Sequence, residues 1–242
     1  MKKIFSLIFI SLLFLSCQSD KPNKEELLEV TKEHQMVYAW ALNAILNYEN
    51  SVSNFIFSGE EKNALYKSEY RKALVKWWDI KSGIDLKSSI EALQNGQMHN
   101  QAFLNDYKDF FNFTEEDLKV YLNKNKEYNA IDNLVWSKKE QLQDKGIIAW
   151  DLVRAIGLVG WGYQADYLTD NEAYDYCLSI SKKVQNNFSS YEEMAGNYLV
   201  GYFFWTMDEA AYNERKEIAN DILKDPNSAW NTFPFDYDIT KR

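Results

Sequence analysis

The sequence predicts an all-α fold, a compact multi-helix domain of about nine or ten helices around one central apolar helix, ending in an irregular aromatic tail. Proline, the residue most hostile to helix interiors, occurs only near the chain ends, at Pro22, Pro226 and Pro234. Apolar residues recur every three or four positions, as a buried helix face requires, and no comparable stretch alternates with a period of two. A hydrophobic content of 46% is enough for the core of one large domain or two closely packed ones.

The order of the helices follows from start signals, in which a hydroxyl residue stands three positions before a carboxylate. These pairs are Ser58 with Glu61, Thr114 with Asp117, Thr169 with Glu172, Ser190 with Glu193, and Thr206 with Glu209. We predict helices at 24–56, 60–78, 84–94, 97–111, 115–124, 127–144, 147–165, 170–187, 190–205 and 208–224. The chain then divides into an N-terminal helical segment (26–69), a helical domain (70–235) and a tail (236–242).

The first residues have the layout of a bacterial lipoprotein signal. Lys2 and Lys3 precede an apolar run at 4–15, which is too short to span a bilayer, and the run ends in "LFLSC", which is similar to a lipobox. We therefore predict a signal peptide at 1–16, a lipidated Cys17, and a polar tether over 17–25 that holds the protein on a membrane of the bacterial cell envelope. An ordinary cleaved signal peptide is the alternative. Cys177, the other cysteine, then has no disulfide partner and is expected to be a small buried side chain.

Charge excludes one class of partner. Without Lys2 and Lys3 the mature chain has 25 basic and 36 acidic residues, a formal net charge of −11. Such a chain repels phosphate backbones, so nucleic acid is not an expected partner.

The central helix, 147–165, lies in "GIIAWDLVRAIGLVGWGY" and contains two charges, Asp151 and Arg154. Each would cost about 2.5–3.5 kcal/mol in a membrane, so we predict a core helix. One turn apart, the two charges can pair, which leaves two interpretations. They form a structural ion pair, or they form the polar floor of a pocket walled by Trp150 and Trp161. The 190–205 helix, which carries Glu193 and Trp205, is expected to pack against them.

Glycines in these two helices have a packing interpretation. "GLVGWG" lacks both the preceding strand and the G-x-G-x-x-G order of a dinucleotide-binding loop. We expect Gly157 and Gly160 to allow another helix to approach closely, with Gly196 and Gly201 doing the same on the partner helix.

Four segments together resemble a bacterial family known as domain of unknown function 1266 (DUF1266). They are "WWDIKSGIDLKSSIEALQNGQMHNQAF" (77–103), "AWDLVRAIGLVGWGYQADYLTDNEAY" (149–174), "NFSSYEEMAGNYLVGYFFW" (187–205) and "DPNSAW" (225–230). The resemblance covers about 70–235 and implies a helical domain, without implying an activity, substrate or cofactor. The chain departs from the family pattern at Gln97, Tyr191 and Tyr202, where His, Trp and Arg are usual.

No residue pattern predicts a cofactor or a metal site. His34 and His99 are the only histidines and belong to no zinc-binding motif, so both are interpreted as surface or packing residues. The carboxylate pairs Glu192/Glu193 and Asp208/Glu209 stand in first turns of predicted helices, where acids stabilise the helix dipole.

Three functional hypotheses remain. The leading one is a noncatalytic module on the envelope that binds an unknown small ligand or protein. The alternatives are an enzyme that uses carboxylates in an aromatic-walled pocket, and an immunity-like protein that neutralises a toxin through its acidic surface.

Overall fold

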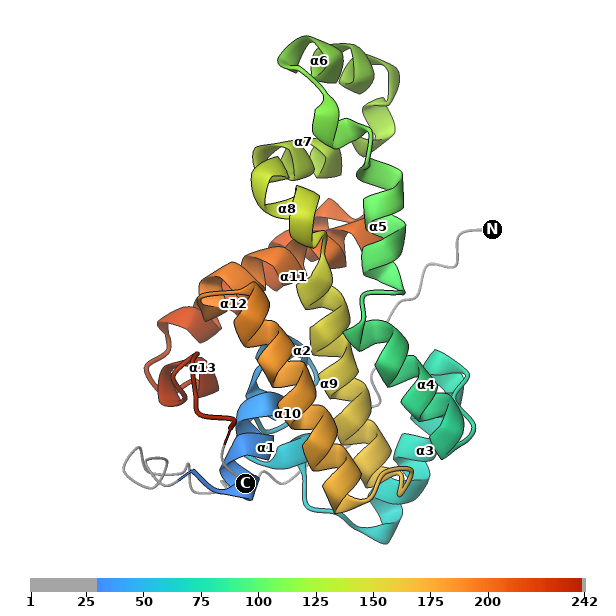
Figure 1. The fold of residues 1–242 in the computed structure, drawn as a ribbon, viewed down its shortest axis with the longest axis vertical. Coiled ribbons are helices and arrows are strands. Elements are labelled where there is room, and N and C mark those ends of the chain that lie inside the picture. Colours follow the sequence, from blue (N-terminus) through green and yellow to red (C-terminus); the bar gives the residue numbers. More distant parts are fainter. Residues whose placement is uncertain (1–29, 241–242) are drawn as a thin grey trace.

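The computed structural model describes residues 30–240 and confirms the all-α prediction. The described part has no strand (Figure 1). Its helices are α1 (Lys32–Ala41), α2 (Ala44–Glu49), α3 (Ala64–Trp78), α4 (Gly83–Gln94), α5 (His99–Tyr107), α6 (Glu115–Lys124), α7 (Asn129–Ser137), α8 (Lys139–Lys145), α9 (Ile148–Gln164), α10 (Asp170–Asn187), α11 (Tyr191–Thr206), α12 (Glu209–Lys224) and α13 (Ala229–Thr232). Short 3-10 helices lie at Phe57–Gly59, Phe110–Asn112 and Lys126–Tyr128. The predictions for residues 1–25, and those for the first residues of the 24–56 helix and of the 26–69 segment, fall outside the described residues.

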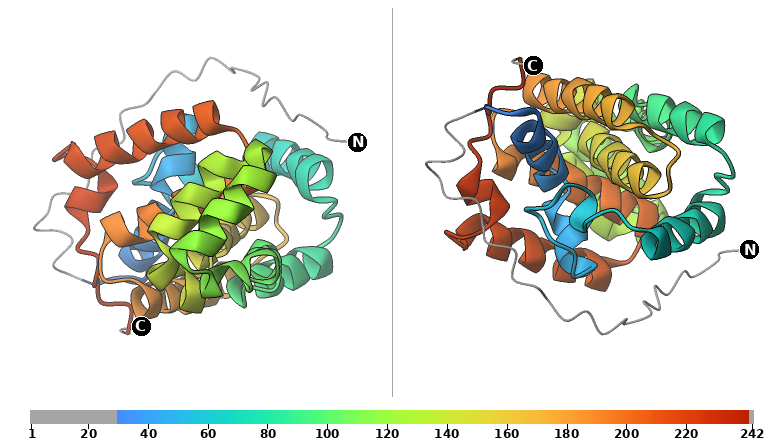
Figure 2. Two further views of the ribbon diagram at one scale, coloured as in Figure 1. Left: turned by 90° about the horizontal axis from the view of Figure 1, so that it is seen from above. Right: turned by 90° about the horizontal axis from the view of Figure 1, so that it is seen from below.

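Helix α9 is the centre of the fold, as predicted. It packs against α4, α10 and α11, and also against α1, α3 and α5 (Figure 2). Every residue from 149 to 160 is buried except Arg154, which is half-buried. Within residues 30–240, no helix is long and apolar enough to cross a membrane.

Three of the five predicted start signals cap helices. Thr114 and Thr169 form reciprocal capping boxes with Asp117 and Glu172, and the Ser190 hydroxyl accepts from the Glu193 N–H. The other two predictions are wrong because a better cap or a tertiary partner takes over.

Ser58 and Thr206 are the hydroxyls that do not cap. The Ser58 hydroxyl accepts a 2.8 Å hydrogen bond from Gln164 Nε2, while Asn63 caps α3 instead. Asp208 caps α12 by accepting from the N–H groups of Ala210 and Ala211.

Two predicted long helices are each divided. The expected 24–56 helix is α1 and α2 followed by irregular chain, and the 127–144 helix is α7 and α8, which meet at Lys138. In the first case, Asn47 Nδ2 donates to the Trp40 carbonyl at the end of α1 and to Asn54 Oδ1. Buried asparagines therefore hold the chain in a turn where apolar spacing alone predicts a continuous helix.

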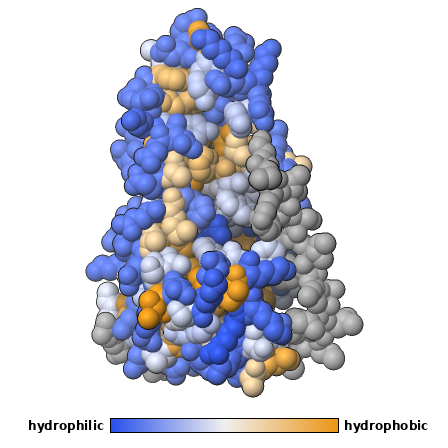
Figure 3. Space-filling model, turned by 90° about the vertical axis from the view of Figure 1, so that its right-hand side faces the viewer, coloured by the Kyte–Doolittle hydropathy of each residue, from blue (hydrophilic) through white to orange (hydrophobic). Residues whose placement is uncertain are grey.

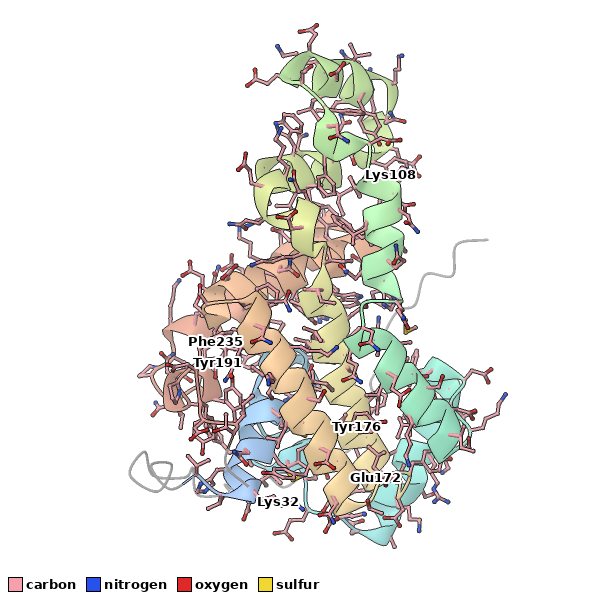
Figure 4. All side chains as sticks on the ribbon, in the orientation of Figure 1. Lys32, Lys108, Glu172, Tyr176, Tyr191 and Phe235 are labelled. Atoms are coloured by element: carbon pink, nitrogen blue, oxygen red, sulfur yellow. The ribbon has the colours of Figure 1, made fainter. Side chains whose placement is uncertain are left out.

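The N-terminal segment and the tail belong to the same core as the domain between them. Tyr38 on α1 stacks on Tyr237 at 5.2 Å between ring centroids, and its hydroxyl donates to the Phe235 carbonyl at 2.6 Å. Gln35 Nε2 donates to the Asp238 carbonyl at 3.0 Å. Figure 4 shows Phe235 beside Tyr191 of α11, with ring centroids 5.0 Å apart.

Two of the four glycines provide the close approach that we predicted. A Cβ at residue 160 would lie 2.4 Å from the Trp40 ring of α1, and one at residue 201 would lie 2.3 Å from Trp150 Cβ of α9. The prediction is wrong for Gly157 and Gly196, where the nearest atoms would be 3.6 and 3.8 Å from an added Cβ.

Candidate functional site

A groove with a volume of about 1910 Å³ contains most of the predicted site residues. Side chains from α2, α3, α5, α6, α7, α9, α11 and α12 line it. Trp77, Trp205 and Met207 on its walls are exposed large hydrophobic residues. Hydrophilic residues cover most of the side of the molecule drawn in Figure 3, and apolar residues form a column near its middle.

Arg154 projects from α9 into a group of three tryptophans, which we call the tryptophan cage: Trp78, Trp150 and Trp205. The carbon of its guanidinium lies 4.4 Å from the ring centroid of Trp78, 4.8 Å from that of Trp150 and 5.5 Å from that of Trp205. Cation–π attraction to three rings holds the side chain in place. Burial lowers the pKa of Arg154 to about 10, so the group stays charged at neutral pH.

The predicted direct ion pair between Asp151 and Arg154 is wrong, because Asp151 pairs with the start of α5. Its Oδ1 lies 2.8 Å from His99 Nδ1, and its Oδ2 accepts a 3.0 Å hydrogen bond from the Asn100 N–H. The carboxylate is 0% exposed and neutralises the positive end of the α5 dipole. Asp151 therefore joins α9 to α5 and leaves Arg154 without its expected partner.

His99 stands between these two residues. In the tautomer whose Nδ1–H donates to Asp151, Nε2 is the one acceptor of the ring, and it lies 3.5 Å from Arg154 Nη1. The His99 side chain is 23% exposed and lines the groove. Its Nε2 therefore holds the Arg154 guanidinium from the α5 side of the groove.

The two groove arginines differ in how far the protein satisfies them. Arg215 forms an ion pair with Glu49 and donates a 3.1 Å hydrogen bond to the Tyr198 hydroxyl. The carbon of its guanidinium lies 4.1 Å from the ring centroid of Tyr202. No carboxylate among residues 30–240 lies within ion-pairing distance of Arg154. Arg154 thus has donors to offer a ligand.

The remaining predicted residues lie in different places. Trp161 is half-buried, lines the groove and packs on Tyr70 at 6.0 Å. Trp205, 44% exposed, lines the groove at the last turn of α11. Glu193 is not brought to the groove: it stands at the opposite end of α11, where its ion pair with Lys145 at 2.7 Å lowers its pKa to about 2. Of the carboxylate pairs, Asp208 and Glu209 line the groove.

Asp132 is a groove residue that sequence reasoning missed. It is 1% exposed on α7, its Oδ1 accepts a 2.8 Å hydrogen bond from the Tyr107 hydroxyl, and its Oδ2 has no partner within the described chain. Burial raises its pKa above the usual value. Within "NAIDNLVW" the residue reads as an ordinary polar position of a helix, so only its tertiary surroundings mark it.

The described chain has no cluster of metal ligands and no accessible thiol. Residues 30–240 contain no group of three His, Cys, Asp or Glu side chains placed to hold a metal ion. Cys177 is fully buried in α10, as expected, and burial raises the pKa of its thiol.

The fold and the groove define the class as an all-α protein with a caged arginine in an aromatic groove. The chain belongs to the family described as protein of unknown function (DUF1266), whose sequence model matches residues 73–235. The match contains the tryptophan cage, His99, Asp132, Asp151 and Arg154. A search of curated proteins and a search of solved structures each found no match.

Proposed function

We propose that this protein is a noncatalytic binding protein that is anchored to the bacterial cell envelope by a lipid on Cys17. Its groove binds a ligand whose anionic group pairs with the Arg154 guanidinium. One observation carries the binding proposal: a charged guanidinium, half-buried in the tryptophan cage, has no carboxylate partner in the described chain. A partly desolvated charge favours a counter-ion, and Asp151, whose charge acts on Arg154, is itself held by α5, so an anionic group of a ligand would complete the pairing.

The chemistry of the cage favours a carboxylate. A guanidinium is a planar fork that matches the two oxygens of a carboxylate, and the three indole faces keep the fork in one orientation. His99 Nε2, 3.5 Å from Arg154 Nη1, accepts from the guanidinium and helps to fix its orientation. Aromatic walls with a few convergent polar groups are typical of sites for small molecules.

Arg154→Gln should abolish the preference of the groove for anions. We expect the parent protein to bind phenylacetate at least tenfold more tightly than neutral phenylacetamide, since a charge-assisted hydrogen bond contributes about 1.5–3 kcal/mol. In Arg154→Gln the two probes should bind equally weakly, as measured by isothermal titration calorimetry.

Arg71→Gln is the matched control, because Arg71 lies outside the groove lining, with its Nε donating to the Ala165 carbonyl. It should keep the full preference for phenylacetate. Equal binding of the two probes by the parent protein, or an undiminished preference in Arg154→Gln, would refute the binding proposal.

Lipidation rests on the N-terminal sequence alone, with Lys2, Lys3, the apolar run and Ser16 preceding Cys17. Intact-mass analysis of protein from bacterial membranes should show a chain that begins at Cys17 and carries at least two acyl groups. Cys17→Ser should move the protein from the membrane fraction to the soluble fraction, because stable anchoring needs more than one chain. An unmodified Cys17 in a soluble mature form would contradict this part of the proposal.

A further inference from the structure

We propose that the ligand of this groove is a short peptide of three or four residues, whose terminal carboxylate binds Arg154 and whose terminal ammonium binds Asp132. The inference rests on the proposed function, because it takes Arg154 as the anion site. It also assigns a binding site to the positively charged end of the ligand, which makes the ligand a zwitterionic peptide.

Asp132 provides a built site for a cationic donor. Its carboxylate is 1% exposed, and the hydroxyl of Tyr107 satisfies only Oδ1, which leaves Oδ2 unpartnered in the described chain. A buried carboxylate oxygen without a donor costs free energy that an ammonium group would recover. Tyr107, Tyr121 and Tyr128 line the same part of the groove and offer aromatic faces to a cation.

The two charged sites are separated along α5. Arg154 meets His99 at the first residue of this helix, and Asp132 meets Tyr107 at its last residue. Residues 99 and 107 are eight positions apart, so at about 1.5 Å rise the two contacts lie about 12 Å apart along the helix axis, which sets the scale of the span. An extended chain spans about 3.3–3.6 Å per residue, so three or four residues reach from one site to the other.

The groove between the sites suits a peptide. Its volume of about 1910 Å³ exceeds the roughly 300–1,000 Å³ of ordinary small-molecule pockets, which leaves space for side chains. Phe204 and Trp205 line it as apolar surface, and Asp106 adds negative charge on the Tyr107 side. A ligand with one charge would leave either Arg154 or Asp132 unpaired, whereas a zwitterion satisfies both.

The test compares three peptides by isothermal titration calorimetry: Ala-Leu-Leu-Ala, its N-acetyl form and its C-terminal amide. For the parent protein, we expect each modification to weaken binding at least tenfold. The dipeptide Ala-Leu, which is too short to span the sites, should also bind at least tenfold more weakly. Asp132→Asn should bind the free and the N-acetylated tetrapeptides alike, whereas the control Asp144→Asn, at an exposed position outside the groove lining, should retain the difference.

The outcomes separate this inference from the proposed function. If N-acetylation has no effect on the parent protein while amidation abolishes binding, Asp132 does not bind the ammonium and the inference fails, but the anion site remains. If no tetrapeptide binds at millimolar concentration while phenylacetate does, the ligand is not a peptide. If amidation has no effect but phenylacetate still binds more tightly than phenylacetamide, the peptide assignment fails and the anion site remains; if neither comparison shows a difference, the proposed function fails as well. Because these comparisons use the parent protein, they do not depend on the folding of a variant.

Discussion

Asp151→Ala is expected to lower the free energy of unfolding by about 3–5 kcal/mol, the usual cost of removing one partner from a buried charged network. The substitution leaves the His99 Nδ1–H and the Asn100 N–H, both held by the 0% exposed carboxylate, without their acceptor. It also removes the charge that stabilises the start of α5. Urea denaturation followed by circular dichroism would measure the change.

Arg154→Ala is the informative comparison for this prediction. If Asp151 and Arg154 formed the direct ion pair expected from their spacing, each single substitution would orphan the other charge and cost a similar amount. Because Asp151 is satisfied by α5, we expect Arg154→Ala to lower the unfolding free energy by no more than about 2 kcal/mol, through lost packing and cation–π contacts. Equal losses in the two variants would contradict the assignment of Asp151 to α5.

Gly201→Ala should destabilise the protein by about 2–3 kcal/mol or more, which reflects overpacking at the crossing of α9 and α11. The added methyl group would lie 2.3 Å from Trp150 Cβ and 2.8 Å from Trp150 Cγ. These atoms are next to the backbone and cannot rotate away, so the two helices must separate. Thermal and urea unfolding would both report the loss.

Gly196→Ala is the matched control on the same helix. Its nearest neighbour would be Lys138 Nζ, 3.8 Å from the new Cβ and at the end of a flexible side chain. Because alanine has a better helix propensity than glycine by about 0.8–1.0 kcal/mol, this variant should be as stable as the parent or slightly more stable. A loss at Gly196 equal to that at Gly201 would show that helix crossing is not the cause.

The sequence was sufficient for the fold class and for the central helix, because both depend on local properties. Proline is absent between residues 23 and 225, and α9 is apolar along its own length. Both properties can be seen in the sequence without knowledge of tertiary contacts. Breaks in helices were not visible, because they come from tertiary hydrogen bonds. Gln164, 106 positions later, donates a hydrogen bond to the Ser58 hydroxyl. Ser58, which the sequence predicts to be a helix cap, therefore has a tertiary partner.

The candidate site could be predicted on α9 and, through Trp205, at the end of α11. Trp150, Asp151, Arg154 and Trp161 follow from one helix, since a charge inside an apolar segment is conspicuous. The partners His99 and Trp78 could not be predicted, because they reach Arg154 from helices 55 and 76 positions earlier. A separation of one turn allows an Asp151–Arg154 pair. The Asp151 carboxylate instead contacts His99 Nδ1 and the Asn100 N–H at the N-terminus of α5.

The contact between α1 and the tail sets a constraint on how the chain is made. Gln35 and Tyr38 donate to carbonyls 203 and 197 residues later, so the first described helix has hydrogen-bond partners that are synthesised much later than the helix itself. At translation rates of about 5–20 residues per second, those partners follow α1 by about 10–40 s. Helices α9 and α10, which also pack on α1, are made before these two acceptors. The packing of α1 is therefore completed only after the segment that contains Phe235 and Asp238 has been made.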